Sequence, residues 1–230
     1  MFAGQVALVT GAAQGIGATI AQALTENGAS VAALDRDTAD VTDAEAVEEA
    51  FTLTEAELGP IDIVVAVAGV LHTGPVTEFS DADWSHTFAV NTTGVFHTCR
   101  AAARRMVPRR RGSIIVISSN AAGVPRAGMA AYAASKAAAT MFTKSLGLEL
   151  APHGIRCNVI APGSTDTPML QAMAGAQHAI DGDPASFRIG IPLGRLADPS
   201  DIADAVLFLA SGRARHITMH ELYIDGGASL

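Results

Sequence analysis

The sequence predicts a single-domain α/β fold in which a doubly wound parallel sheet carries helices on both faces. Three observations predict it. Short apolar runs alternate with longer stretches of helical apolar spacing along the whole chain. Most of the short runs are continuously apolar, which is typical of parallel strands covered on both sides. The chain of 230 residues contains no Pro/Gly/Ser-rich linker, so residues 1–230 are expected to form one domain.

The first elements follow the order strand, turn, helix, strand, helix. The run QVALVT at 5–10 reads as a strand that ends in a glycine cluster. Apolar residues then recur at helical spacing over 16–27, until a glycine stops the helix. A second strand at 30–34 ends at Asp35, and an acidic stretch leads into a helix that runs through Leu58.

The rest of the chain continues the alternation. Strands are expected at 61–66, 112–118, 155–160 and 222–224, and helices at 81–106, 131–150 and 199–210. The segment 166–195 breaks the pattern with methionines and several glycines. Its length indicates a substrate lid that crosses the edge of the sheet.

Charge and composition exclude several functions. The formal charge of -8 argues against a nucleic-acid partner, and the one basic run, 104–111, is expected to be a solvated helix end. No run of 18 apolar residues and no secretory leader is present, so we expect a cytoplasmic protein without a membrane partner. Cys99 and Cys157 stand in apolar contexts without metal-ligand spacing, which predicts buried thiols and no metal site.

The first glycine cluster lies between the first strand and the first helix. Gly11 permits a tight turn, Gly15 lets the backbone approach a pyrophosphate, and Gly17 allows the helix to pack closely on the strand. The N-terminus of the helix offers N–H groups and positive potential to a phosphate. Ordinary strand-to-helix turns also contain glycines, but the strand before this cluster and the helix after it favour a dinucleotide site.

Asp35 lies at the tip of the second strand, 18 residues past Gly17. A carboxylate there can accept hydrogen bonds from both hydroxyls of the adenosine ribose and repel a 2′-phosphate. NAD is therefore favoured over NADP as the cofactor. Arg36, the next residue, is able to pair with a 2′-phosphate and keeps NADP as the alternative.

Tyr132 and Lys136 form a YxxxK spacing on a predicted helix. One helical turn places both on the same face, where an ammonium favours ionisation of the phenol. An ionised phenol can take the proton of a substrate hydroxyl as its hydride leaves. The spacing alone is common, but Ser119, at the end of a buried strand, adds a hydroxyl that can bind the reacting oxygen. Asn91, inside a long apolar helix, needs a specific partner or an ordered water.

Together these residues resemble the short-chain dehydrogenase/reductase family, and the resemblance extends from Gly4 to Gly227. It implies a Rossmann fold with a catalytic tetrad. In that tetrad Tyr132 is the base, Lys136 lowers its pKa and holds the nicotinamide ribose, Ser119 orients the hydroxyl, and Asn91 supports a proton-relay water. The resemblance further implies cofactor contacts from Gly11, Gln14, Gly15, Ile16, Gly17, Asp35, Arg36, Asp40, Val41, Ala68, Gly69, Tyr132, Lys136, Pro162, Gly163, Thr165 and Thr167.

One departure from the family pattern follows the third predicted strand. The usual Asn-Asn-Ala-Gly or Asn-Ala-Ala-Gly stands here as Ala66-Val67-Ala68-Gly69. Because the amide side chains that normally bind the central sheet are absent, we expect a modest loss of rigidity there and no loss of function.

Several stretches outside the general motifs resemble one branch of the family. That branch oxidises a ring hydroxyl of a cyclohexadiene carboxylate with NAD in catechol siderophore biosynthesis. The stretches are 83–91, 125–136, 156–167, 190–196 and 216–227. The resemblance implies a small cyclic hydroxy-carboxylate as substrate, whose carboxylate requires a cation. Arg126, in the loop before Tyr132, is the first candidate, and Arg188, in the lid segment, is the second.

The resemblance also implies a homotetramer that packs through the helices of Asn91 and Tyr132, and the apolar face of Ala133, Ala137 and Phe142 fits such an interface. Three other functions stay open. The ring substrate could carry an amine, as in a dihydro-hydroxyanthranilate dehydrogenase. A 3-oxoacyl-carrier-protein reductase would normally use NADPH, against which Asp35 argues. A non-enzymatic scaffold is disfavoured by the intact tetrad.

Overall fold

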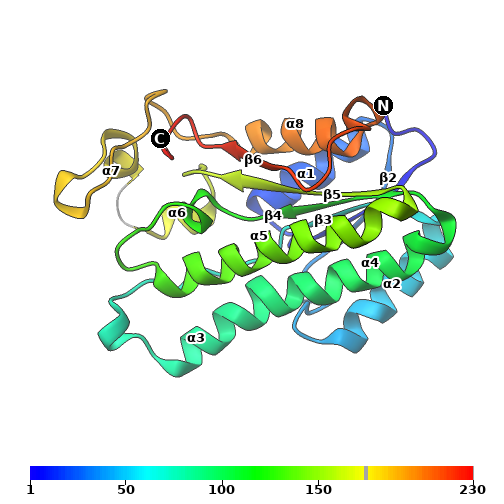
Figure 1. Cartoon of the computed structure of the whole chain (residues 1–230), viewed down its shortest axis with the longest axis horizontal. Helices are drawn as coiled ribbons and strands as arrows, with labels where there is room; N and C mark the ends of the chain where they lie inside the picture. The colour runs from blue at the N-terminus through cyan, green and yellow to red at the C-terminus, as the bar shows by residue number, and fades with distance from the viewer. Residues whose placement is uncertain (174–175, 230) are drawn as a thin grey trace.

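Six apolar runs pair side by side into one parallel sheet with the order β2-β1-β3-β4-β5-β6 (Figure 1). The computed structural model describes residues 1–173 and 176–229. The strands are β1 (Val6–Thr10), β2 (Ser30–Leu34), β3 (Ile61–Ala66), β4 (Gly112–Ile117), β5 (Ile155–Pro162) and β6 (Glu221–Ile224). The order reverses between β1 and β3, as it does in doubly wound sheets. The predicted fold class is confirmed.

Helices cover both faces of this sheet, as Figure 1 shows. α1 and α8 lie on one face, and α2, α4 and α5 lie on the other. The described helices are α1 (Gly15–Glu26), α2 (Ala44–Leu58), α3 (Asp81–Phe88), α4 (Val95–Arg109), α5 (Ala130–Leu150), α6 (Pro168–Gln171), α7 (Ala176–Asp181) and α8 (Pro199–Ala210). Single 3-10 turns occupy Val76–Glu78, Asn120–Ala122, Ala151–His153, Pro184–Ser186 and Gly212–Ala214.

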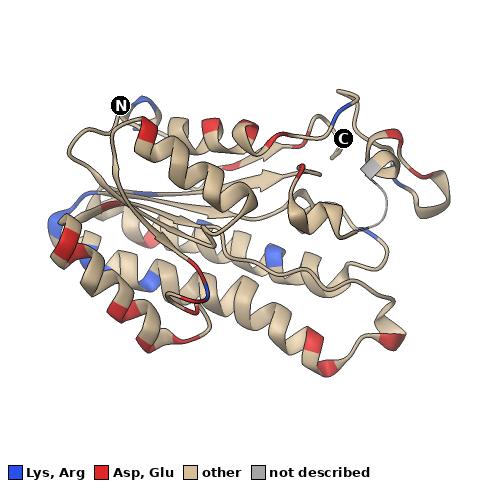
Figure 2. Cartoon of the chain, turned by 180° about the vertical axis from the view of Figure 1, so that it is seen from behind, with Lys and Arg blue, Asp and Glu red and all other residues tan. Residues whose placement is uncertain are grey.

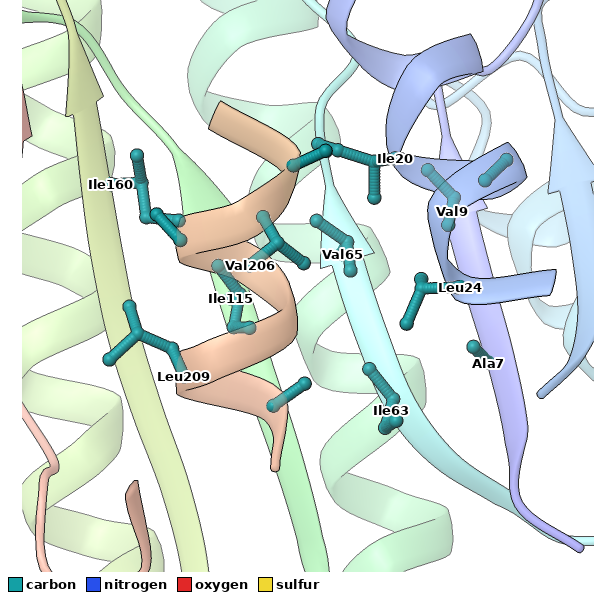
Figure 3. Packing of buried hydrophobic residues seen from close by; sticks show 14 of the residues in the cluster. Ala7, Val9, Ile20, Leu24, Ile63, Val65, Ile115, Ile160, Val206 and Leu209 are labelled. Atoms are coloured by element: carbon teal, nitrogen blue, oxygen red, sulfur yellow. The ribbon is translucent and has the colours of Figure 1, made fainter. Parts of the chain in front are cut away.

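The central strands are buried on both faces because a helical layer covers each side. Every residue of β1 and β3 is buried, which explains their continuous apolar sequences. Figure 3 shows one of the two cores, where Val206 and Leu209 of α8 pack over Ile115 and Ile160 of the sheet. The edge strand β2 has no fully buried residue; its residues are exposed or half-buried.

The helix predicted over 81–106 is divided. α3 and α4 are joined by a π-helical turn at Ala89–Gly94, and α4 continues to Arg109. Arg110, with a φ of 53°, ends α4 in the left-handed conformation. A π-helical turn inserts one extra residue per turn and re-aims the side chains that it carries. The side chain that it re-aims here is Asn91.

The interpretation of the basic run 104–111 as a solvated helix end is wrong for two of its arginines. Arg105 is mostly buried, packs over the ring of Phe51 and pairs with Glu48 at 2.8 Å. Arg109 donates to the carbonyl of Ile61 at 2.5 Å. Figure 2 shows these basic residues gathered where α4 ends, next to acidic ones. The run therefore ties α4 to α2 and to the start of β3.

The segment 166–195 leaves the carboxyl end of β5 and carries α6, α7 and the 3-10 turn Pro184–Ser186. Figure 1 shows it at the end of the molecule where the strands finish. Residues 174–175 of the predicted lid lie outside the described residues. Within the described ranges, no helix is long and apolar enough to cross a membrane, and no group of three His, Cys, Asp or Glu side chains could hold a metal ion.

Candidate active site

A cavity of about 730 Å³ opens at the carboxyl edge of the sheet. It is lined by the residues that directly follow five strands: Gly11 after β1, Asp35 after β2, Val67 after β3, Ser118 after β4 and Gly163 after β5. In doubly wound sheets, ligands bind outside this edge at the point where the strand order reverses. The topology thus places the cavity where a dinucleotide is expected.

The glycine-rich turn between β1 and α1 fits a phosphate group. Gly11 has a φ of +68°, and a Cβ there would lie 2.7 Å from the backbone of Ala68. A Cβ on Gly17 would lie 2.0 Å from the carbonyl oxygen of Gly11, so only glycine lets α1 pack on the turn. Gln14 occupies the N-cap position before α1, and its side chain does not cap the helix. The N–H groups of the first helical turn are therefore left facing the cavity.

The adenosine side of the cavity is acidic. The Asp35 carboxylate accepts hydrogen bonds from the N–H of Ala13 at 2.9 Å and of Arg36 at 2.7 Å, which fixes it at the cavity wall. Asp40 accepts from the N–H and the hydroxyl of Thr42, both at 2.8 Å, and these bonds lower the pKa of its carboxyl. Val41, which also lines the cavity, rests against the open face of Gly94.

The loop that departs from the family pattern is held by other groups. The Thr10 hydroxyl accepts hydrogen bonds from the N–H groups of Val67 and Ala68 at 3.2 and 3.4 Å. Further along the loop, the Asn91 side chain accepts a hydrogen bond from the N–H of Val70 at 2.8 Å and donates one to the Val70 carbonyl at 2.9 Å. The backbone that carries Ala68 and Gly69 into the cavity therefore has anchors at both ends.

Tyr132 and Ser119 lie next to each other in the wall of the cavity. Ser119 follows β4 and begins the 3-10 turn, where its hydroxyl accepts from the N–H of Ala121 at 3.1 Å. Tyr132 lies in the first turn of α5 and is 9% exposed. Burial raises the pKa of its phenol, and a hydrogen bond with Ser119 opposes that rise. The lowered pKa expected of this tyrosine thus requires a further positive charge in the cavity.

Lys136 reaches the cavity one helical turn after Tyr132. Its Nζ donates to the carbonyl of Ile117 at 2.9 Å and lies 5.8 Å from the centre of the Tyr132 ring. Burial without a carboxylate partner lowers the pKa of the ammonium to about 8. Hydrogen-bond acceptors such as ribose hydroxyls would therefore stabilise the charged ammonium.

Asn91 does not line the cavity and is fully buried behind it. Besides holding Val70, its Nδ2 donates to the Ser135 hydroxyl at 3.0 Å, and Ser135 in turn donates to the carbonyl of Tyr132 at 2.7 Å. A Cβ on Gly69 would meet both the Asn91 Oδ1 and the Lys136 Nζ within 3.3 Å. Asn91 is therefore a positioning residue that joins the Gly69 loop to α5.

The nicotinamide side of the cavity is built after β5. The Gly163 N–H binds the carbonyl of Ile224 at 2.9 Å, and a Cβ on Gly163 would lie 2.6 Å from the Cβ of Asp225. The Thr167 hydroxyl caps α6 by accepting from the N–H of Leu170 at 3.3 Å. Pro162 and Thr165 line the same wall.

Apart from Asn91, every residue predicted to contact cofactor or substrate lines this one cavity, including both candidate arginines. Two groups of the site were not predicted from the sequence. His86 lines the cavity from α3, and the Thr10 hydroxyl holds the loop after β3. The threonine before the glycine cluster was a visible signal. For His86 no local pattern pointed to the site.

Comparison with known proteins agrees with this geometry. The family model described as "Enoyl-(Acyl carrier protein) reductase" matches residues 37–229, and the one described as "short chain dehydrogenase" matches residues 5–39. The chain is 51% identical to 2,3-dihydro-2,3-dihydroxybenzoate dehydrogenase of Bacillus subtilis, over 99% of this chain and 97% of that protein. It is 41% identical to the vibriobactin-specific 2,3-dihydro-2,3-dihydroxybenzoate dehydrogenase of Vibrio cholerae, over 97% and 95%.

More distant relatives share the fold and differ in name. A 3-oxoacyl-[acyl-carrier-protein] reductase of Escherichia coli is 36% identical over 98% of both chains. A short-chain type dehydrogenase/reductase of Mycobacterium marinum superimposes with a TM-score of 0.92 at 32% identity, over 99% of this chain and 96% of that one. The 3-ketoacyl-(acyl-carrier-protein) reductase of Brucella melitensis, crystallised with NADH, also gives 0.92 at 30% identity and covers 100% of both chains.

Proposed function

The chain belongs to the short-chain dehydrogenase/reductase family of oxidoreductases, and from this premise we propose that it oxidises 2,3-dihydro-2,3-dihydroxybenzoate to 2,3-dihydroxybenzoate with NAD. The observation that carries the proposal is the identity of 51% to a relative of that name, over nearly the full length of both proteins. The cavity supports it, because its wall combines Ser119, Tyr132 and Lys136 with arginines suited to a carboxylate.

The reaction removes a hydride from a ring carbon and a proton from its hydroxyl. NAD supplies the hydride acceptor and a positively charged ring, which together with Lys136 favours ionisation of Tyr132. Tyr132 takes the hydroxyl proton as the general base, and Ser119 holds the reacting oxygen by a hydrogen bond. The ketone then loses a ring proton and gains one on oxygen, which yields the aromatic catechol.

The residues of the cavity fit NAD. The uncapped N-terminus of α1 and the open glycine turn suit the pyrophosphate, and Lys136 suits the nicotinamide ribose. The Asp35 carboxylate is placed to accept hydrogen bonds from the adenosine ribose hydroxyls and to repel a 2′-phosphate. For this reason NAD is proposed rather than NADP, although the family as a whole uses both.

The substrate carboxylate is assigned to Arg126. This arginine lines the cavity from the loop between β4 and α5, the helix that carries Tyr132. A planar guanidinium binds a carboxylate by two parallel hydrogen bonds and fixes the orientation of the ring. We place the reaction in catechol siderophore biosynthesis, as the word vibriobactin in the name of one relative suggests.

A homotetramer is proposed through the outer face of α3, α4 and α5. Trp84, Phe96, Met141 and Leu148 are 46, 38, 62 and 67% exposed, which is unusual for large apolar side chains on one helical layer. The Phe96 ring meets Phe142 edge-on at 5.9 Å. Light scattering should give a tetramer that Met141→Glu dissociates. A monomeric parent would contradict the assignment.

Two alternative substrates remain to be compared. Relatives at 36% identity favour the activity of an acyl-carrier-protein reductase, and Asp35 argues against it. The amino analogue of the ring substrate would use the same carboxylate site and the same base. Direct comparison of turnover of the dihydroxy acid, its amino analogue and an acyl thioester separates the three.

Tyr132→Phe tests the assigned base. The variant removes only the ionisable oxygen, so NAD binding should be near normal while turnover is lost. Tyr223→Phe is the matched control, because Tyr223 is the only other tyrosine of the chain and does not line the cavity. Turnover of Tyr132→Phe within about threefold of the parent would rule out Tyr132 as the base.

A further inference from the structure

We propose that Arg188 is a second substrate-binding residue, and that it acts together with Arg126, which lines the same cavity, so that the two guanidinium groups bind the substrate carboxylate. This inference rests on the proposed function for the identity of the ring. The charged group that it recognises is inferred from two arginines that line one cavity without an ion-pair partner among the described residues.

The two arginines reach the cavity from segments far apart in sequence. Arg126 lies in the loop between β4 and α5, and Arg188 follows the 3-10 turn Pro184–Ser186. Both line the cavity that also holds Tyr132 and Met129. Because the base and both cations line one cavity, a substrate whose carboxylate is bound by the arginines keeps its ring in the cavity that Tyr132 lines.

The loop of Arg126 is braced at its far end. The carbonyl of Arg126 accepts from the N–H of Met129 at 3.2 Å, and the carbonyl of Gly128, a residue with a φ of +73°, accepts from the N–H of Gly74 at 2.9 Å. This bracing holds the loop against the segment after β3. The guanidinium is half-buried, so its position is set by the cavity wall and not by solvent alone.

The turn of Arg188 is closed even more tightly. Asp183 and Arg188 exchange two backbone hydrogen bonds, both at 2.9 Å, and Ile191 donates to the carbonyl of Ile180 at 2.9 Å. The flanking glycines have left-handed backbones, and a Cβ on Gly182 would lie 2.6 Å from the Arg188 carbonyl oxygen. Such close backbone contact fixes the Cα from which the Arg188 side chain enters the cavity.

The guanidinium groups of Arg126 and Arg188 have no anionic partner in the part of the chain that the structure describes. Within residues 1–173 and 176–229, no carboxylate lies within ion-pair distance of either guanidinium. Burial and the charge of Arg188 lower the pKa of Arg126, while the charge of Asp225 opposes that effect. Two half-buried like charges in one cavity are unfavourable until an anion binds to them.

The substrate carboxylate is the anion that best fits this place. The pyrophosphate of NAD belongs at the glycine turn, at the start of α1, where N–H groups are available to it. Arg126 instead lies in the loop that leads into α5, the helix of Tyr132, and Arg188 lines the same cavity. A carboxylate bridged by two arginines gains charge-assisted hydrogen bonds on both oxygens.

The test compares two ligands that differ only in the carboxylate, 2,3-dihydroxybenzoate and catechol, by calorimetric titration of the NADH-bound enzyme. Arg188→Gln should weaken 2,3-dihydroxybenzoate by about tenfold or more and change catechol by less than about twofold. Arg126→Gln should do the same, and Arg188→Lys should recover part of the loss because it keeps the charge. Arg213→Gln is the control, since this exposed arginine lies outside the cavity.

Three results would overturn the proposal. The first is an equal loss for both ligands in Arg188→Gln, and the second is no loss for either. The third is weaker binding of NADH with unchanged selectivity, which would assign Arg188 to the cofactor pyrophosphate. Because the readout is binding, it stands apart from the proposed reaction. An enzyme that binds the carboxylate selectively but does not oxidise the dihydroxy acid would refute the proposed function and leave the two-arginine site in place.

Discussion

Replacing Asn91 by alanine should destabilise the protein more than its single polar side chain suggests. The amide is fully buried and makes three hydrogen bonds, of 2.8 and 2.9 Å to the backbone of Val70 and of 3.0 Å to the Ser135 hydroxyl. Each such bond contributes about 1 kcal/mol, and stranding the Val70 groups adds to the cost, so the expected loss is about 3–5 kcal/mol.

For a chain of this length, a loss of that size lowers the melting temperature by about 6–20 °C. Thermal unfolding followed by circular dichroism measures it. Thr92→Val is the matched control, because it removes one hydrogen bond from the same π-helical turn, that of the Thr92 hydroxyl to the Ser135 carbonyl at 3.1 Å. The control should melt about 2–4 °C below the parent.

The two variants decide the role assigned to Asn91. If Asn91→Ala melts no lower than Thr92→Val, Asn91 does not hold the loop after β3, and the anchoring role is refuted. Loss of turnover with a melting temperature near that of the parent would instead favour the proton-relay role that the sequence predicts.

Three further predictions concern the cofactor side of the cavity. Burial lowers the pKa of Lys136 to about 8 from its usual 10.5, so between these values the unfolded chain holds a proton that the folded chain lacks. This side chain therefore makes stability rise with pH over that window, and urea unfolding of Lys136→Met should lack the rise; an unchanged pH profile would contradict it. Gly17→Ala places a Cβ 2.0 Å from the Gly11 carbonyl oxygen and should weaken NAD by about tenfold or more. The control Gly212→Ala enters open space and should bind NAD normally. Asp35→Asn should reduce the preference for NAD over NADP by about tenfold in kcat/KM, and an unaltered ratio would remove Asp35 from cofactor selection.

The sequence predicted those parts of the site that depend on local patterns joined by topology. Gly11 and Gly17 stand after one strand, and Tyr132 and Lys136 lie one helical turn apart. In a parallel sheet all strands end at the same edge, so groups such as Ser119 converge there without any knowledge of side-chain packing.

The parts that the sequence could not predict depend on long-range contacts. Asn91 was expected to have a specific partner or an ordered water, but no local pattern names Val70 and Ser135, the partners 21 and 44 residues away at which the π-helical turn aims it. Arg105 was expected in solvent, but Glu48 and the ring of Phe51 lie opposite it on α2. No local periodicity encodes a partner on another helix.

The loop after β3 shows the same limit in a milder form. Its missing asparagines suggested lost hydrogen bonds, and the structure supplies others from Thr10, on a neighbouring strand. The pKa of Tyr132 is also a property of its surroundings. Spacing from Lys136 predicted a lowered value, while burial raises it in the protein without its cofactor.

The central claim is that this cavity oxidises a carboxylated dihydroxy-cyclohexadiene with NAD. The most direct measurement is the initial rate of NADH formation from 2,3-dihydro-2,3-dihydroxybenzoate, followed by absorbance beside parallel reactions with NADP and with the amino analogue of the substrate. The account predicts rapid turnover of the dihydroxy acid with NAD and much slower turnover in both parallel reactions. Absence of turnover with the dihydroxy acid, or a preference for the amino analogue or for NADP, would contradict it.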